Sequence, residues 1–151
     1  MKKMYTTIFA LLISAISFAQ VYEFRVITSV ESIVPMGIGR SRLIETTEEK
    51  DYQALTTSRS KGNDSKIGKV KRKDAKVDNL NETKLLNFYS GVGINFRNIA
   101  SNDALITSML NQMSIEGWEL MTVVSGVESD AGEKDGKGIF ITRFIFKRIK
   151  E

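Results

Sequence analysis

The chain of 151 residues contains no cysteine and no histidine. Disulfides are therefore impossible, and side-chain packing alone must hold the fold together. The usual zinc sites, Ser-His and Cys-His nucleophile pairs and an imidazole base are also excluded. The enzyme chemistries that remain use carboxylates, a Ser-Lys pair, tyrosine or an oxygen-ligated cation, and we expect no cofactor.

Residues 1–19 have the pattern of a cleavable signal peptide. Lys2 and Lys3 precede an apolar run over residues 8–16, and small residues stand at the −3 and −1 positions before Gln20. The run is shorter than the ~20 apolar residues that a membrane span needs. The sequence predicts an exported protein, periplasmic or secreted, with no transmembrane anchor after cleavage.

The remaining residues 20–151 are expected to form a single domain. Cleavage removes two lysines and no acidic residue, so the net charge falls from +4 to +2. This weak basicity is not the signature of a nucleic-acid-binding protein, and no nucleic acid is expected as a partner.

Hydrophobic periodicity predicts an α+β fold, with a small, mostly antiparallel sheet and one main helix packed on one face. In the first strand Tyr22, Phe24 and Val26 alternate with Glu23 and Arg25. The last strand is apolar on both faces, which favours a central position in the sheet or a second layer over it. The predicted strands cover residues 21–30, 40–45, 118–124 and 139–148. In the third of these, Leu120, Thr122 and Val124 are expected on one side.

The helix is predicted from about Asp103 to Glu116, with Ser101 and Asn102 as suitable N-caps. An apolar stripe should face the sheet, and Gly117 should end the helix in a left-handed conformation. The stripe comprises Leu105, Ile106, Met109, Leu110 and Met113.

Residues 45–83 are poor in large apolar side chains and are expected to form a long mobile insertion, with a short hairpin at its base. Residues 59–76 contain eight basic side chains, which suggest contact with an anionic polymer or surface. A solvated loop is the simpler interpretation. The candidate binding residues are Lys66, Lys69, Lys71, Arg72 and Lys73, together with Arg40 and Arg42 beside a glycine turn that could form a backbone anion nest.

The run Glu116-Gly117-Trp118-Glu119-Leu120 is the most recognisable motif. Together with the first strand and the ending Phe144-Ile145-Phe146-Lys147-Arg148, it resembles a small bacterial domain family of unknown function. The resemblance covers residues 22–30 and about 102–148, and excludes the insertion. It implies the same fold and no activity. The pattern of the residues themselves predicts structural roles for Gly117, at the end of the helix, and for Trp118, in the core beneath it.

Two groups of acidic residues are candidate sites. Glu116 and Glu119 could act as an acid/base pair, although a helix end and an outward-facing strand residue explain them more simply. The loop over residues 126–138 carries four carboxylates (Glu128, Asp130, Glu133 and Asp135) but does not match a calcium-binding loop, so no metal site is expected.

These features favour a non-enzymatic binding or interaction module whose partner is an envelope protein or an anionic polymer. Two alternatives stay open. One is a small hydrolase that uses carboxylates or a Ser-Lys pair, with Glu116, Glu119, Ser125 and Lys134 as candidates. The other is a structural subunit of an envelope assembly.

Overall fold

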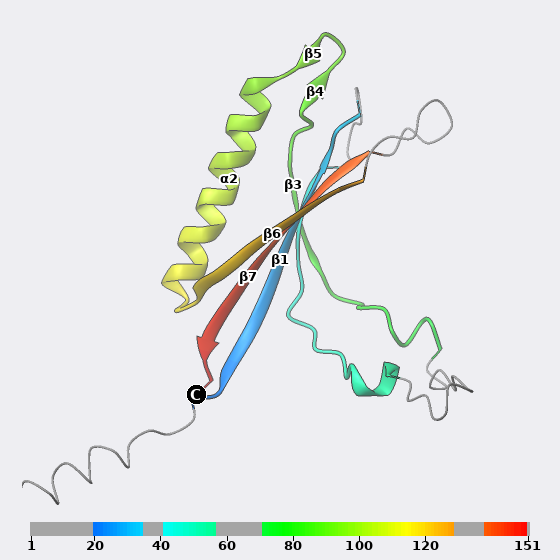
Figure 1. The fold of residues 1–151 in the computed structure, drawn as a ribbon, viewed down its shortest axis with the longest axis vertical. Coiled ribbons are helices and arrows are strands. Elements are labelled where there is room, and N and C mark those ends of the chain that lie inside the picture. Colours follow the sequence, from blue (N-terminus) through cyan, green and yellow to red (C-terminus); the bar gives the residue numbers. More distant parts are fainter. Residues whose placement is uncertain (1–19, 35–40, 57–70, 129–137, 151) are drawn as a thin grey trace, which may run out of the picture.

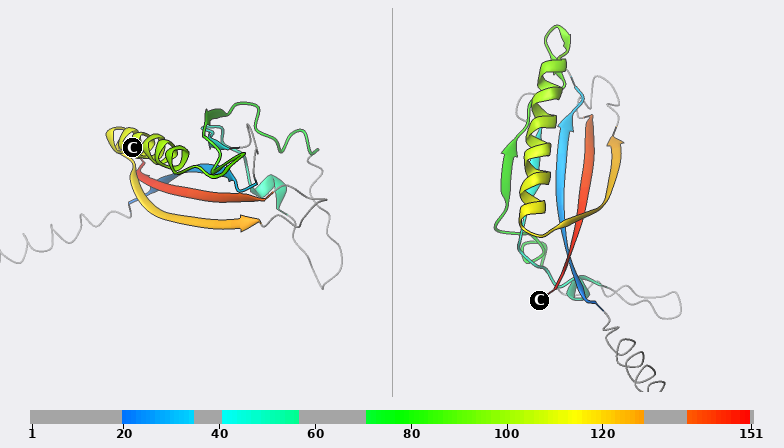
Figure 2. Two further views of the ribbon diagram at one scale, coloured as in Figure 1. Left: turned by 90° about the horizontal axis from the view of Figure 1, so that it is seen from above. Right: turned by 90° about the vertical axis from the view of Figure 1, so that its left-hand side faces the viewer.

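The computed structural model describes residues 20–34, 41–56, 71–128 and 138–150. Five antiparallel strands form one sheet in the order β3-β2-β1-β7-β6, and the helix α2 lies across one face (Figures 1 and 2). The α+β prediction is confirmed. The elements are β1 (Tyr22–Ser32), β2 (Arg42–Glu45), the 3-10 turn η1 (Gln53–Leu55), β3 (Asn81–Lys84), β4 (Tyr89–Ser90), β5 (Gly93–Ile94), α2 (Phe96–Ile115), β6 (Glu119–Glu128) and β7 (Ile139–Ile149).

The last strand, β7, lies between β1 and β6, so the predicted central position is confirmed. Phe144 and Phe146 point towards α2 and are buried in the core. Ile141 and Ile145 alternate with them and therefore face the other side of the sheet. The core between sheet and helix consists of Ile27, Leu43, Leu85, Met113, Trp118, Phe144 and Phe146, with Ile106, Met109 and Leu110 packed against it.

The helix begins seven residues before the predicted start. Asn95 is the N-cap, and its side chain accepts a hydrogen bond from the Asn98 amide at 3.2 Å. Asn102, predicted as a cap, instead lies within the helix, where its side chain is fully buried and forms hydrogen bonds with neighbouring elements. Asparagine suits both positions because its short amide can satisfy backbone groups, and the sequence alone does not distinguish them. Within the described residues no helix is long and apolar enough to cross a membrane.

The helix ends as predicted at Gly117, which has a φ of 81°. The Gly117 amide donates to the Ser114 carbonyl at 3.1 Å, and the Trp118 amide donates to the Met113 carbonyl at 2.9 Å. These two bonds form a Schellman motif, which reverses the chain into β6.

The strand β6 does not alternate as predicted. Its pairing with β7 shifts between Leu120 and Thr122, and Met121 is the extra residue. Leu120 lies opposite Phe146, on the α2 side, whereas Thr122 lies opposite Ile145, on the other face. A bulge has no requirement for a particular residue here, so simple alternation missed it. The strand also extends to Glu128, past the predicted end at Val124.

The predicted hairpin at the base of the insertion is present, because β2 pairs with β3 from Arg42–Lys84 to Glu45–Asn81. A second set of contacts joins the two arms beyond this hairpin. Glu48 accepts hydrogen bonds from the amides of Asp78 (2.9 Å) and Asn79 (3.1 Å), and Thr46 Oγ1 donates to the Asn79 carbonyl at 2.8 Å. The hydrogen bond with the Lys50 ammonium, followed by the two amide bonds from Asp78 and Asn79, lowers the pKa of Glu48 to about 2.

Candidate functional site

A groove runs between α2 and the strands β1, β2 and β3, with a volume of about 330 Å³. Its floor is apolar and includes the buried side chains of Ile27, Leu43 and Met113. Leu105 and Met109 line it from the helix. The rim is polar and consists of Glu45, Asn81, Thr83, Ser108, Gln112 and Glu116. A concave apolar site with a few polar groups at its edge is typical of ligand-binding pockets, and this volume lies in their range.

The groove exists because the helix covers only part of the sheet. The stripe of Ile106, Met109, Leu110 and Met113 packs against the core, whereas the helix presents Ser108 and Gln112 towards β3. These small or polar side chains do not reach across to the exposed edge strand. The apolar floor between them therefore stays accessible.

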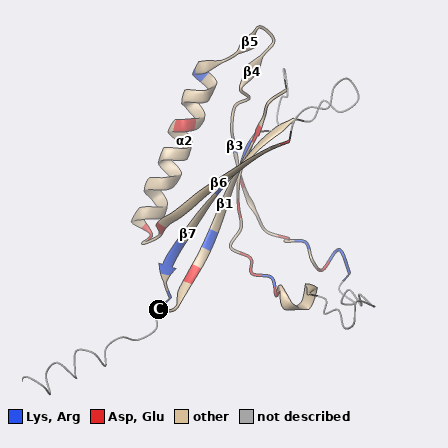
Figure 3. Ribbon diagram, viewed as in Figure 1, with Lys and Arg blue, Asp and Glu red and all other residues tan. Residues whose placement is uncertain are grey.

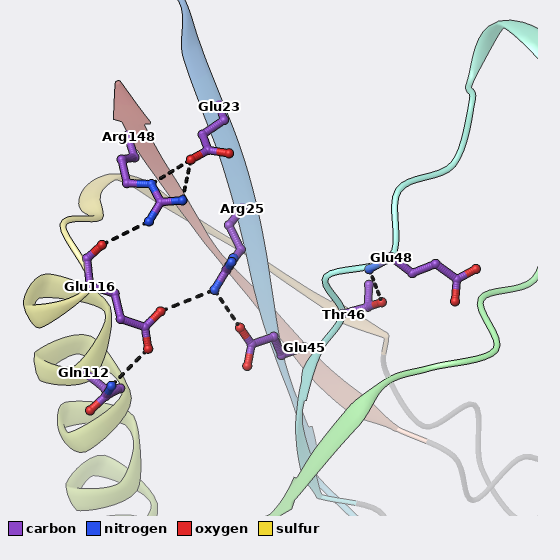
Figure 4. Close-up of polar contacts among 8 residues, drawn as sticks. All are labelled: Glu23, Arg25, Glu45, Thr46, Glu48, Gln112, Glu116 and Arg148. Atoms are coloured by element: carbon purple, nitrogen blue, oxygen red, sulfur yellow. Dashed lines mark hydrogen bonds and ion pairs between the residues drawn. The ribbon is translucent and has the colours of Figure 1, made fainter. Parts of the chain in front are cut away.

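Arg25 bridges two carboxylates that line one end of this groove, Glu45 and Glu116 (Figure 4). Its Nη1 lies 3.3 Å from Glu45 Oε1 on β2 and 3.5 Å from Glu116 Oε2 at the end of α2. Gln112 Nε2 donates to the other oxygen of Glu116 at 3.0 Å. One guanidinium thus connects two rim carboxylates from different elements, and the three groups together carry one net negative charge.

Trp118 links this cluster to the end of the sheet. The Cζ atoms of Arg25 and Arg148 lie 4.5 Å and 4.3 Å from the centre of its ring, within the range of cation–π contact. Arg148 also donates to Glu23 at 2.6 Å and to the Glu116 carbonyl at 3.2 Å, which satisfies a free carbonyl at the helix end. The indole is therefore the common contact of both arginines.

A second polar cluster lies further along the helix, inside the core. Asn102 Nδ2 donates to Glu31 Oε1 at 2.9 Å and to the Leu86 carbonyl at 2.7 Å, while Asn102 Oδ1 accepts from the Leu86 amide at 2.8 Å. Burial raises the pKa of Glu31, an effect that the Asn102 hydrogen bond opposes and the nearby Asp103 reinforces. These bonds join α2, β1 and the segment before β4, so the cluster is structural.

The residues predicted as structural occupy the expected places. Trp118 is buried in the core cluster, and Gly117 ends the helix. Glu119 points out of the sheet and lies 3.4 Å from Lys147 Nζ.

The candidate catalytic groups are only partly brought together. Glu116 and Glu119 both line a hollow beyond the helix end, but Glu116 is held by Arg25 and Gln112 while Glu119 is held by Lys147. Ser125 is absent from that lining, and its hydroxyl shares a hydrogen bond with Thr142 at 3.1 Å. Lys134 lies outside the described residues.

The candidate anion-binding residues do not line the groove. Arg42 lies 3.7 Å from Glu82 and donates to the Ser41 carbonyl at 2.9 Å. Lys71, Arg72 and Lys73 are on the segment that leads into β3, where Figure 3 shows a run of basic residues. Arg40, Lys66 and Lys69 fall outside the described residues, so their role in binding stays a prediction.

The carboxylates of the predicted 126–138 loop are described only at Glu128, which ends β6; Asp130, Glu133 and Asp135 fall outside the described ranges. In the part of the chain that the structure describes, no three acidic side chains are close enough to hold a metal ion.

Neither the groove nor the bridge that Arg25 forms between Glu45 and Glu116 was predicted from the sequence. The sequence places Glu23 and Arg25 on the face of the first strand opposite Phe24, and in the structure this is the face that the helix covers. The only available signal was the strand's alternation, which identifies two faces without saying which one the helix covers.

No protein family model, curated protein or solved structure matches this chain. The resemblance to the domain family with the Glu-Gly-Trp-Glu-Leu motif therefore stays a prediction that rests on those motif residues.

Proposed function

We propose that this chain is an exported, non-enzymatic binding module, and that its groove along α2 takes an extended peptide segment of a partner protein. The observation that supports the proposal is the groove itself, with an apolar floor and a rim of hydrogen-bonding side chains. The floor suits one or two apolar side chains of a ligand.

The position of β3 favours a peptide over a compact small molecule. In the described sheet β3 is an edge strand, so its outward amides and carbonyls are available to pair with an added strand. A peptide that adds to β3 would run beside the groove and place alternate side chains towards it. Asn81 and Thr83, which line the groove, are the β3 residues on that side.

The charges at the rim define which residue should flank the apolar anchor. Glu45 and Glu116 share the single cation Arg25, so one negative charge is left at this end of the groove. A lysine or arginine of the ligand would neutralise it, whereas an acidic residue would be repelled. We therefore expect a ligand in which a large apolar residue stands next to a basic one.

The basic segment of the insertion supports a separate contact. Within the described residues no ion pair involves Lys71, Arg72 or Lys73, so their charges are available to an anionic polymer. Deleting residues 48–80 removes this segment and keeps β2, β3 and the groove. The deletion is therefore expected to abolish binding of anionic polymers and to preserve peptide binding, and unchanged polymer binding would exclude the role of the insertion.

Selection from a random peptide display library, with the purified protein as bait, tests the groove. Enriched peptides should share an apolar residue beside a basic one. Filling the groove with Ser108→Phe should weaken the best peptide about tenfold or more, since one buried apolar side chain contributes roughly 1.5–3 kcal/mol. Ser114→Phe is the matched control, because Ser114 is exposed on α2 and does not line the groove.

Two results would contradict the proposal. One is a library that yields no enriched sequence. The other is a peptide that binds wild type and Ser108→Phe equally. Mass spectrometry of the protein from each cell fraction tests export separately, and a mature chain that begins at Gln20 is expected.

A further inference from the structure

No described element covers the face of the sheet opposite α2 (Figure 2). This face carries an extended set of apolar side chains, interrupted on β7 by two cations, Arg143 and Lys147. Phe24 is 59% exposed, Ile149 51% and Val124 47%. They come from the adjacent strands β1, β7 and β6, and Ile145 lies between Val26 and Thr122 in the pairing. We call this surface the open face; its further apolar members are Tyr22, Val26, Val30, Ile44, Ile139 and Ile141.

Soluble monomers seldom expose contiguous apolar surfaces of this kind, and larger ones mark interaction sites. The alternation of β1 makes the point directly. From Tyr22 to Val26 the apolar residues face away from the helix, while Glu23 and Arg25 form ion pairs on the helix side. The first half of the strand, before the core residue Ile27, therefore has its large apolar side chains on the side where this chain supplies no cover among the described residues.

We propose that a second copy of this chain covers the open face, so that two sheets pack face to face in a symmetric dimer. Two observations favour a second copy: the balance of charges at the borders of the face and the size of the face.

The borders carry charges of both signs. On the open face β6 contributes Glu119 and Glu128, the adjacent β7 contributes Arg143 and Lys147, and the opposite border on β2 and β3 contributes Arg42, Lys84 and Glu82. A two-fold axis parallel to the strands places the β6 border of one copy over the β3 border of the other. Glu128 then approaches Lys84 of the second copy, and the symmetry creates this pair twice.

The area is sufficient for a weak dimer. At ~3.3 Å per residue and ~4.8 Å between strands, β1, β7 and β6 present a flat area of roughly 500 Å², and β2 and β3 add about 130 Å². Specific interfaces bury at least about 1,200 Å² in total, or roughly 600 Å² per partner. The face thus reaches the lower limit of this class, and we expect reversible association in the micromolar range. The groove lies on the other side of the sheet, so dimerisation leaves it open.

Sedimentation velocity of the purified protein, produced from the full coding sequence, tests the proposal over about 5 to 500 µM. The wild type should change from monomer to dimer across this range. Phe24→Lys should stay monomeric, because it removes a large apolar side chain and places a second, unpaired cation beside Lys147 in the interface of each copy. Phe96→Lys is the matched control, since Phe96 is 75% exposed at the start of α2 and lies away from the open face.

Val124→Lys on β6 provides an independent disruption if Phe24→Lys does not fold, with the fluorescence of the single tryptophan as the folding check. The border arrangement is tested by charge reversal: Glu128→Lys and Lys84→Glu should each weaken the dimer, and the double variant should restore it. A wild type that stays monomeric at 500 µM overturns the proposal. So does a dimer that survives both lysine substitutions, and an unrestored double variant overturns the arrangement.

Discussion

Replacing Asn102 by alanine should destabilise the fold far more than an ordinary surface substitution on the same helix. The Asn102 side chain is fully buried and makes three hydrogen bonds of 2.7–2.9 Å, two to the Leu86 backbone and one to Glu31. Each hydrogen bond contributes about 1 kcal/mol to the free energy of unfolding, and removing the Asn102 amide leaves the Leu86 backbone and Glu31 without a hydrogen-bond partner in its place. The gain in helix propensity offsets about 0.6 kcal/mol, so the expected loss is about 2–3 kcal/mol.

Urea denaturation followed by far-UV circular dichroism measures this loss. At a typical slope of roughly 1.5 kcal/mol/M, the midpoint of unfolding should fall by about 1.5 M with an unchanged slope. Asn111→Ala makes the same substitution at an exposed position of α2 and should cost nothing. If Asn102→Ala lowered the free energy of unfolding by less than about 1 kcal/mol, or by no more than Asn111→Ala, the Asn102 hydrogen bonds would not be what holds the helix to the sheet.

Three further substitutions test the helix end, the buried carboxylate and the base of the insertion. Gly117→Ala should lower the free energy of unfolding by about 1 kcal/mol in urea denaturation, because Gly117 has a positive φ that alanine adopts only with strain. Gly126→Ala, at an open position on β6, should not lower it. Equal effects of the two substitutions would refute the role of φ. Because burial raises the pKa of Glu31, its ionised form costs stability at neutral pH, and this cost disappears as the pH falls through the folded pKa towards the ordinary 4.5. Glu31→Gln should therefore be more stable than wild type at pH 7, with a difference that narrows as the pH is lowered, and a widening difference would contradict the assignment. The pKa of Glu48 is lowered, so the fold favours its ionised form. Its contacts therefore persist at neutral pH and are lost as the pH falls through about 2. Glu48→Gln should accelerate hydrogen exchange at the Asn79 amide near neutral pH. An unchanged exchange rate would show that the Glu48 carboxylate does not hold the two arms together.

The sequence was a good guide wherever a local pattern has a single physical meaning. A glycine after an apolar helical stripe predicts a left-handed helix end, and Gly117 has that conformation. A strand that is apolar on both faces is predicted to lie inside the sheet rather than at its edge, and β7 lies between β1 and β6. These features depend on backbone geometry and on burial, which the residues themselves encode.

The features that the sequence did not predict have a common cause, since each depends on contacts between residues that are distant in the chain. Asn102 reads as a cap by composition, but its partners Leu86 and Glu31 become visible only when α2 lies on the sheet. The bulge at Met121 depends on the register with β7. Alternation likewise divided Arg25 from Phe24 correctly but left open which of them faces the helix, and the groove and the open face both follow from that choice.

The most direct test of the groove is to map the binding of the selected peptide by amide chemical shifts in ¹⁵N-labelled protein. We expect the largest changes on β2 and β3 from Leu43 to Glu45 and Asn81 to Lys84, and on Ser108 and Gln112 of α2. The indole signal of Trp118 should also move, because Arg25 contacts both its ring and the rim carboxylates. Changes confined to β6 and the open face, or to residues 71–76, would show that the peptide binds elsewhere and would contradict the account.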